Sequence, residues 1–300
     1  MNNAPYTVVG LGELLWDILP SGEQLGGAPA NFAYMSALLG DRGVVASRVG
    51  ADALGTRAVD RLTQAGLATS HVQVDDRRAT GTVKVRLDEQ AKPTFAITGD
   101  VAWDFLEWTA GWQGLAAQAD AVCFGSLAQR SPQSRATIRR FLEATRGDAL
   151  TFFDVNLRAP FYSARVLTES LKLARAVKLN DEEVGVVTKL CGLNGGGDED
   201  GVRRLMRAYD LEMICVTRGE RGSLLLTEAE AAEHPGFRLD AVDTVGAGDA
   251  FSAAVVHHYL RGASLGRIGD AANRLGAWVA SRSGAMPAAE QSVLSEIVRA

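Results

Sequence analysis

The segment that ends at Asp249 combines residue types suited to chemistry. It reads Asp243-Thr244-Val245-Gly246-Ala247-Gly248-Asp249 and runs into a helical pattern over 249–261. Small residues in front of a helix expose backbone N–H groups at the positive end of its dipole, which makes a site for an anion such as phosphate. A carboxylate beside that anion is repulsive unless it handles a proton, so Asp249 is a candidate general base. The alternative is that Asp249 only caps the helix.

A second group of candidates lies near the N-terminus. Gly26-Gly27-Ala28-Pro29-Ala30-Asn31 precedes a helix predicted over 29–39. Paired glycines let the backbone approach a ligand closely, and the Asn31 amide can donate and accept hydrogen bonds there. Asp17 follows the first predicted strand, so its carboxylate falls where open α/β sheets bind ligands. A plain strand-to-helix connection would explain the glycines but not Asn31, and a solvated loop is the alternative for Asp17.

Three further polar segments follow or join predicted strands. Asp154-Val155-Asn156-Leu157-Arg158 closes one strand. The segment Lys178 to Glu183 runs a strand into a helix with Asn180 as a natural N-cap, and capping alone would explain it. Thr217 to Gly222 separates two strands, either as a hairpin turn or as a backbone cradle for a nucleotide.

The overall composition limits the classes of partner. The chain has 300 residues, 31 Lys and Arg against 36 Asp and Glu, and 47% hydrophobic residues. This acidic balance without a long basic run argues against nucleic acid and anionic membranes and favours a small neutral or anionic substrate. No apolar stretch approaches the ~20 residues of a membrane span and the N-terminus lacks a basic leader, so a cytoplasmic location is expected. Cys123, Cys191 and Cys215 lie far apart and predict buried free thiols.

The elements that must position these residues alternate along the chain. Short apolar runs rich in β-branched residues are separated by helical patterns, which predicts an α/β fold with a parallel sheet and helical crossovers. The predicted strands are 6–11, 44–49, 121–125, 150–155, 176–179, 213–217 and 223–226. The predicted helices are 29–39, 133–145, 165–175, 181–190, 199–208, 249–261 and 266–282.

The stretch from Thr80 to Thr98 breaks this rhythm. Apolar and charged residues alternate over 82–87, a polar turn follows at 88–93, and 94–97 is again strand-like. The pattern is typical of an antiparallel hairpin with one apolar face. That face must be buried, either as a lid over the ligand end of the sheet or in a dimer contact.

Taken together, these motifs resemble the ribokinase-like (PfkB) family of carbohydrate kinases in order and spacing. The glycine pair with Asn31, the segment 180–183, the segment 217–222 and the loop 243–249 carry the resemblance, which spans nearly the whole chain. Gly26 to Asn31, the opening Gly12-Glu13 with Asp17, and Asp154 to Arg158 are most similar to fructokinases. The resemblance implies a single domain, 1–300, with a doubly wound, mostly parallel sheet flanked by helices. It also implies a small β-sheet lid, the hairpin at about 80–98 with the segment 12–27, over a sugar site.

The resemblance also implies roles for individual residues. Asp249 would take the proton from a sugar hydroxyl, and the backbone amides of Gly246, Ala247 and Gly248 would hold the transferring γ-phosphate. The residues implied to bind the sugar are Asp17, Gly27 and Asn31, with Arg158 close to the substrate or the phosphate.

The cofactors implied are ATP and Mg²⁺. The residues implied to line the nucleotide site are Asn180, Thr217, Gly219, Gly222 and Asn273. Glu183 completes an N-x-x-E pattern with Asn180 and would organise Mg²⁺ through water. Some members of the family bind a monovalent cation near the loop that starts at Asp243, which makes this residue a candidate site for K⁺.

The function implied is an ATP-dependent sugar kinase that converts fructose to fructose 6-phosphate. The alternatives are a kinase for a 2-keto-3-deoxy acid, whose carboxylate Arg158 could pair with, or for ribose. A non-catalytic sugar-binding module is disfavoured because the Asp249 loop is intact. A serine hydrolase is disfavoured because no histidine follows the Gly-x-Ser-x-Gly at 262–266. Only eight residues, 18–25, connect Asp17 to the glycine pair, which predicts a reduced lid there. A homodimer that forms through the lid is a further expectation.

Overall fold

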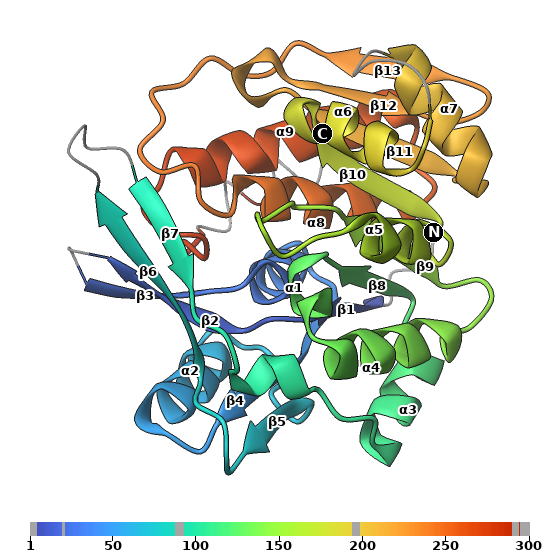
Figure 1. The fold of residues 1–300 in the computed structure, drawn as a ribbon. Coiled ribbons are helices and arrows are strands. Elements are labelled where there is room, and N and C mark those ends of the chain that lie inside the picture. The colour runs from blue at the N-terminus through green and yellow to red at the C-terminus, as the bar shows by residue number, and fades with distance from the viewer. Residues whose placement is uncertain (1–4, 20–21, 88–92, 194–198, 290–293, 295–300) are drawn as a thin grey trace.

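Two sheets form the framework of the chain (Figure 1). Within the residues described, the large sheet has nine strands in the order β13-β12-β11-β10-β9-β8-β1-β4-β5, and the small sheet has the order β3-β2-β6-β7. This computed structural model describes residues 5–19, 22–87, 93–193, 199–289 and 294. The turn predicted at 88–93 lies outside the described residues except for Pro93.

The elements have the following bounds. The large sheet contains β1 (Thr7–Leu11), β4 (Arg42–Gly50), β5 (Val72–Asp75), β8 (Ala121–Phe124), β9 (Leu150–Asp154), β10 (Ala176–Asn180), β11 (Met213–Thr217), β12 (Ser223–Leu226) and β13 (Ala231–His234). The small sheet contains β2 (Leu15–Leu19), β3 (Gly22–Gly26), β6 (Gly81–Leu87) and β7 (Pro93–Ile97). The α-helices are α1 (Ala28–Leu38), α2 (Ala53–Gln64), α3 (Ala110–Gln118), α4 (Pro132–Glu143), α5 (Ala164–Leu171), α6 (Asp181–Leu190), α7 (Glu199–Tyr209), α8 (Ala247–Tyr259) and α9 (Leu265–Ala280). Short 3₁₀ helices span η1 (Ala102–Phe105), η2 (Leu127–Arg130) and η3 (Gly219–Arg221).

The large sheet is doubly wound. Its strands from β5 to β11 pair in parallel, and β12 and β13 add an antiparallel edge. Helices α1, α2, α8 and α9 pack on one face, and α3 to α7 pack on the other, so the central strands are apolar on both sides. The winding changes direction between β1 and β8, which is where a ligand crevice is expected in such a sheet.

Most of the predicted elements, and the predicted α/β fold with a small β sheet, are confirmed. One predicted helix needs correction. The helix predicted over 165–175 ends at Leu171, and the sequence patterns did not reveal α2, α3, β5 or β13. The segment 18–25 forms most of the hairpin β2–β3, and β2 pairs in parallel with β6, while the expectation of a reduced lid stays a prediction. In the described residues, no helix has both the length and the apolar character needed to span a bilayer.

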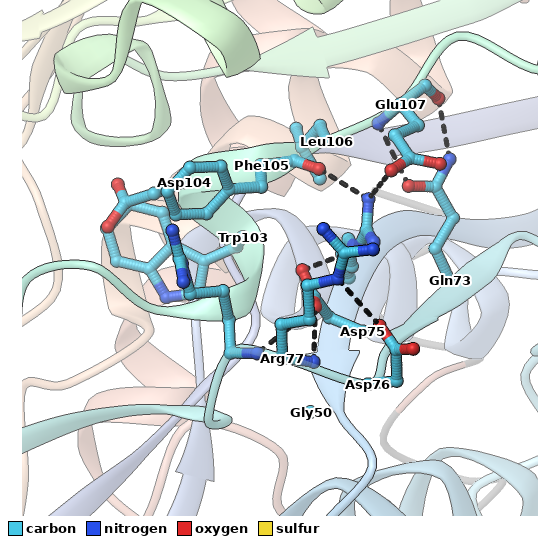
Figure 2. Close-up of polar contacts among 12 residues, drawn as sticks. Gly50, Gln73, Asp75, Asp76, Arg77, Trp103, Asp104, Phe105, Leu106 and Glu107 are labelled. Atoms are coloured by element: carbon cyan, nitrogen blue, oxygen red, sulfur yellow. Dashed lines mark hydrogen bonds and ion pairs between the residues drawn. The ribbon is translucent and has the colours of Figure 1, made fainter.

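Polar contacts anchor the segments that lead into and out of the β6–β7 hairpin (Figure 2). Arg48 on β4 binds Asp75 at the end of β5, with Nε and Oδ2 3.1 Å apart, and donates to the carbonyl oxygen of Phe105 at 2.7 Å. Gln73 donates to the carbonyl oxygen of Glu107 at 2.6 Å and accepts from its N–H at 3.0 Å (Figure 2). These bonds join the chain on both sides of the hairpin to the rim of the large sheet.

Candidate active site

A cavity of about 550 Å³ lies between the two sheets. Its polar wall follows the carboxyl ends of β1, β8 and β9, and all four strands of the small sheet contribute side chains to it. The predicted site residues that line it are Asp17, Gly27, Asn31, Arg158, Asp243, Gly246, Gly248 and Asp249. The cavity therefore sits at the switch point of the sheet, where this architecture binds ligands.

Asp249 and Asn31 meet in this cavity although 218 positions separate them. Asn31 Nδ2 donates to Asp249 Oδ2 at 2.7 Å, and both residues are buried. Gly10 allows this meeting, because a Cβ there would lie 1.9 Å from the carbonyl oxygen of Pro29 and would push α1 away from β1. The N-cap of α8 is Gly246, so the alternative in which Asp249 only caps the helix is wrong.

The start of α8 is an open helix end. Gly246 is left-handed with φ 81°, and no side chain caps the helix. The N–H of Ala247 donates a hydrogen bond to the carbonyl oxygen of Thr244 at 3.3 Å. Gly248 lines the cavity beside Asp249. An uncapped helix N-terminus attracts an anion through its free amides and its dipole.

The carboxyl group of Asp249 titrates close to neutral pH. Burial, and next the charge of Asp154, raise the pKa of Asp249 from 3.8 to about 6, while the hydrogen bond from Asn31 opposes that rise. A pKa near the working pH suits a group that accepts a proton during a reaction.

Glu13 is a site residue to which the Gly12-Glu13 motif assigned no role. It follows β1, lines the cavity and is 4% exposed. Burial raises the pKa of Glu13 from 4.5 to about 7. Among the described residues, Glu13 Oε2 and Asn31 Oδ1 are buried acceptors without a hydrogen-bond partner. Two residues of the cavity wall thus each hold a buried oxygen that lacks a donor.

We expect Glu13→Gln to stabilise the protein at pH 8 and to have little effect near pH 4.5. The folded state binds the Glu13 proton more tightly than the unfolded state, so the stability that this proton contributes is lost as the pH rises through about 7. The rise in pKa corresponds to about 3 kcal/mol at most, and the neutral amide avoids that cost. Urea unfolding at both pH values tests this, and a variant less stable than wild type at pH 8 would contradict it.

Asp17 extends from the small sheet into the cavity. It lies on β2, and a Cβ on Gly26 would be 2.6 Å from its Oδ2, so the glycine leaves room for this carboxylate. Burial raises the pKa of Asp17 to about 6, and the nearby Arg158 opposes the rise. Arg158 itself is exposed, and its Nη1 donates to the carbonyl oxygen of Leu157 at 3.1 Å.

The residues predicted to bind a nucleotide lie outside the cavity, along the adjoining edge of β10, β11 and β12. Asn180 pairs in register with Thr217. Gly219 is the first residue of the η3 turn between β11 and β12 and Gly222 follows the turn, with φ of 58° and 79°. Asn273 on α9 donates to Ser223 Oγ at 2.7 Å, which fixes the helix against the start of β12. The segment 217–222 therefore forms a turn between two antiparallel strands, and its role as a nucleotide cradle stays a prediction.

Glu183 and Asp243, the predicted metal residues, both bind backbone groups. Glu183 accepts from the N–H groups of Asn180 (2.9 Å) and Leu157 (2.7 Å), and Asn180 accepts from the N–H of Glu183 (2.8 Å), which confirms Asn180 as an N-cap. Asp243 accepts from the N–H groups of Val245 and Gly284, both at 3.0 Å. In the part of the chain that the structure describes, no three His, Cys, Asp or Glu side chains gather to hold a metal ion.

The fold and the cavity define a class of enzyme. The site lies at the switch point of a doubly wound sheet and combines a carboxyl group that titrates near neutral pH with an open helix N-terminus. The carboxyl group can deprotonate an acceptor and the helix N-terminus can hold an anionic group, so the site is suited to transferring an anionic group to that acceptor. The chain belongs to the pfkB family of carbohydrate kinases, whose pattern matches residues 22–292.

Individual relatives agree with this assignment. An uncharacterized sugar kinase from Pyrococcus horikoshii is 30% identical over 95% of this chain and 93% of its own, and its crystal structure has a TM-score of 0.84 with 99% of each chain covered. Fructokinase from Escherichia coli is 30% identical over 93% of this chain and 94% of its own. Fructokinase from Vibrio cholerae, solved with fructose, ADP and calcium, is 26% identical with a TM-score of 0.83 and covers 99% of this chain and 100% of its own.

Proposed function

We propose that the protein transfers the γ-phosphoryl group of ATP to the primary hydroxyl of fructose and releases fructose 6-phosphate and ADP. The observation that carries the proposal is the position of Asp249, which is buried in the cavity beside the open start of α8. A proton acceptor and an anion site at one point are what this transfer needs. The fructokinases from E. coli and V. cholerae support fructose as the acceptor.

The free acceptors of the cavity favour a neutral sugar. Glu13 Oε2 and Asn31 Oδ1 have no partner among the described residues, and Asp17 lies on the opposite wall. Sugar hydroxyls donate to such oxygens, whereas a carboxylate substrate would meet several acidic groups. Arg158, the residue expected to pair with the carboxylate of a 2-keto-3-deoxy acid, lines the cavity but is exposed.

The chemistry follows from these positions. Asp249 takes the proton of the acceptor hydroxyl while that oxygen forms a bond to the γ-phosphorus and the bond to the leaving ADP oxygen breaks. The negative charge on the transferred group lies at the start of α8, where the amides of Gly246 and Gly248 and the helix dipole stabilise it, joined by the amide of Ala247 once its 3.3 Å bond to the Thr244 carbonyl oxygen is released. Gly27 lets the chain pass Glu13 closely, because a Cβ there would lie 2.5 Å from the Glu13 carbonyl oxygen.

The nucleotide would bind along Asn180, Thr217, Gly219, Gly222 and Asn273. Both oxygens of Glu183 already accept backbone hydrogen bonds, so this residue fits Mg²⁺ through the waters of the ion rather than by direct ligation. When bound, the ion would neutralise phosphate charge.

Asp243 is the proposed K⁺ residue. It accepts hydrogen bonds from the N–H groups of Val245 and Gly284 and so joins its own loop to the C-terminal turn. A V. cholerae fructokinase mutant solved with potassium supports the proposal. Turnover with and without K⁺ tests that role.

The small sheet is proposed to be a lid over the sugar. Leu15, Asp17 and Val83 line the cavity from strands β2 and β6, so the sheet already forms one of its walls. A wall that closes on the sugar excludes water and prevents ATP hydrolysis. A homodimer through the same sheet is the second proposal, and light scattering of the intact protein distinguishes a dimer from a monomer.

The experiment that tests the function measures ADP and sugar phosphate together. Purified protein with ATP and Mg²⁺ is offered fructose, ribose, 2-keto-3-deoxygluconate and glucose in parallel. We expect the highest kcat/KM with fructose and one sugar phosphate per ADP. A higher kcat/KM with the keto acid or with ribose would replace fructose as the substrate, and ADP release without any phosphorylated product would overturn the kinase proposal.

Asp17→Ala should raise the KM for the sugar by about tenfold or more and leave the KM for ATP within about twofold. The variant removes an acceptor of sugar hydroxyls from the small-sheet wall of the cavity, and hydrogen bonds to charged groups contribute about 1.5–3 kcal/mol. Steady-state kinetics with each substrate varied in turn measure both constants. Equal increases in the two constants would place Asp17 elsewhere than at the sugar.

A further inference from the structure

Lys178 is a buried cation that the proposed site has not used. It lies on β10 and is 7% exposed, yet it lines the cavity. Its Nζ is 3.0 Å from Asp154 Oδ1 and 3.4 Å from Asp154 Oδ2, and Asp154 Oδ2 also accepts from Ser252 Oγ at 2.8 Å. Asp154 is thus bound on both oxygens, while Lys178 reaches the cavity wall.

The ammonium group faces the start of α8. A Cβ on Gly248 would lie only 2.9 Å from Lys178 Nζ, so the ammonium rests against the backbone of Gly248. An ammonium group has three N–H donors, and among the described residues Lys178 Nζ donates to Asp154 alone. An anion held at the amides of α8 would therefore meet this positive charge from the β10 side.

Lys178 stays protonated in this environment. Burial favours the neutral form, but the charges of Asp154, Glu183 and Asp249 outweigh burial and raise the pKa of Lys178 above its ordinary value of 10.5. The positive charge is therefore present throughout the pH range in which Asp249 can act as a base.

A purely structural role explains this pair poorly. Desolvating two charges costs several kcal/mol per ion, and apolar replacements of buried ion pairs are often neutral or stabilising. A pair kept only for stability also has no reason to line the cavity and lie against Gly248.

We infer that Lys178 is a catalytic residue whose ammonium binds the oxygens of the transferring phosphoryl group and stabilises their charge in the transition state. The inference rests on the proposed kinase function. The acceptor proton goes to Asp249, the new P–O bond forms at the acceptor oxygen, and the P–O bond to ADP breaks. Lys178 keeps its proton throughout.

The test is the double variant K178M/D154N. Lys178→Met alone would leave Asp154 as an unpaired buried carboxylate and could unfold the protein, whereas the double variant removes both charges and keeps both shapes. We expect a melting temperature close to that of wild type, a kcat lowered by ~10²-fold, and a sugar KM within about threefold. Ser252→Ala is the matched control, because it removes a bond to Asp154 but leaves Lys178 in place, and its kcat should stay within about threefold.

A binding measurement gives a readout independent of turnover. Calorimetry with Mg²⁺ and sugar compares ADP alone with ADP plus aluminium fluoride, which mimics the transferring group. We expect wild type to bind ADP more tightly with aluminium fluoride, and the double variant to lose about tenfold or more of that gain without a change for ADP alone.

Wild-type protein measured alongside separates the two claims. If wild type is active and the folded double variant keeps near wild-type kcat, or loses affinity for ADP alone to the same extent, only the assignment of Lys178 fails. If wild type phosphorylates no sugar and shows no gain with aluminium fluoride, the proposed function fails, and the inference on Lys178 is overturned with it.

Discussion

Asp249→Asn should lower kcat by at least ~10²-fold with saturating sugar, the scale of general-base catalysis. The amide has the shape of the carboxyl group and can still accept the hydrogen bond from Asn31, so the cavity should keep its form. What it loses is the ability to take the hydroxyl proton. Burial raises the pKa of Asp249 to about 6, so the charged group costs folding energy at pH 8 and its removal should stabilise the protein there.

The combination of lower kcat and higher stability distinguishes this prediction from simple damage. Steady-state kinetics give kcat, calorimetric titration gives the affinity for ADP, and thermal unfolding at pH 8 gives the stability. Asp60→Asn on α2 is the matched control, because that side chain is exposed and lies outside the cavity between the sheets. If the Asp249→Asn variant retains more than a tenth of the wild-type kcat, another group accepts the proton.

The sequence predicts the core of the fold because its central strands are short apolar runs. Strands β1, β8 and β9 are buried on both faces. Strands of this kind are nearly continuous apolar runs, which can be recognised in the sequence without knowledge of the fold. The hairpin β2–β3 is different, because its polar residues Glu23 and Gln24 give no alternating pattern and its order comes from pairing within the small sheet. Helix α2 is a different case, because its buried residues Gly55, Ala58 and Leu62 follow the i, i+3, i+7 spacing of an amphipathic helix, so the sequence contains a pattern that the prediction omitted.

The residues of the candidate site also fall into two groups, those that the sequence predicts and those that only the tertiary structure reveals. Asp249 and Asn31 stand in recognisable local motifs, and their hydrogen bond confirms that they share one cavity. Glu13 and Lys178 stand in the quoted segments Gly12-Glu13 and Lys178 to Glu183, but nothing local in those segments indicates that the two side chains are buried in the site. Glu13 follows a strand and Lys178 lies in one, and charged side chains ordinarily face solvent. The burial of these two side chains depends on helices that come from distant parts of the chain. Such residues become visible only when the tertiary structure is known.

Gly246→Ala should lower kcat by ~10²-fold or more, the second large effect that we expect. Gly246 has φ 81°, a left-handed conformation that costs a residue with a side chain about 1–3 kcal/mol. A Cβ there would also lie 2.5 Å from the Cβ of Ala285, so the loop or the C-terminal turn must move. The amides that would hold the transferring phosphate follow directly in the chain, and losing one such donor typically costs about 10²–10³-fold in rate.

The effect should depend on the position of the glycine and not on the added methyl group. Gly114→Ala is the control, because Gly114 lies inside α3 with open space around its Cβ and alanine is the better helix former by about 1 kcal/mol. We expect the control to be at least as stable as wild type with unchanged kcat. The Gly246→Ala variant should melt lower, and its kcat should remain low at temperatures where circular dichroism shows it fully folded. If its kcat under those conditions equals that of wild type, the start of α8 does not hold the transferring group.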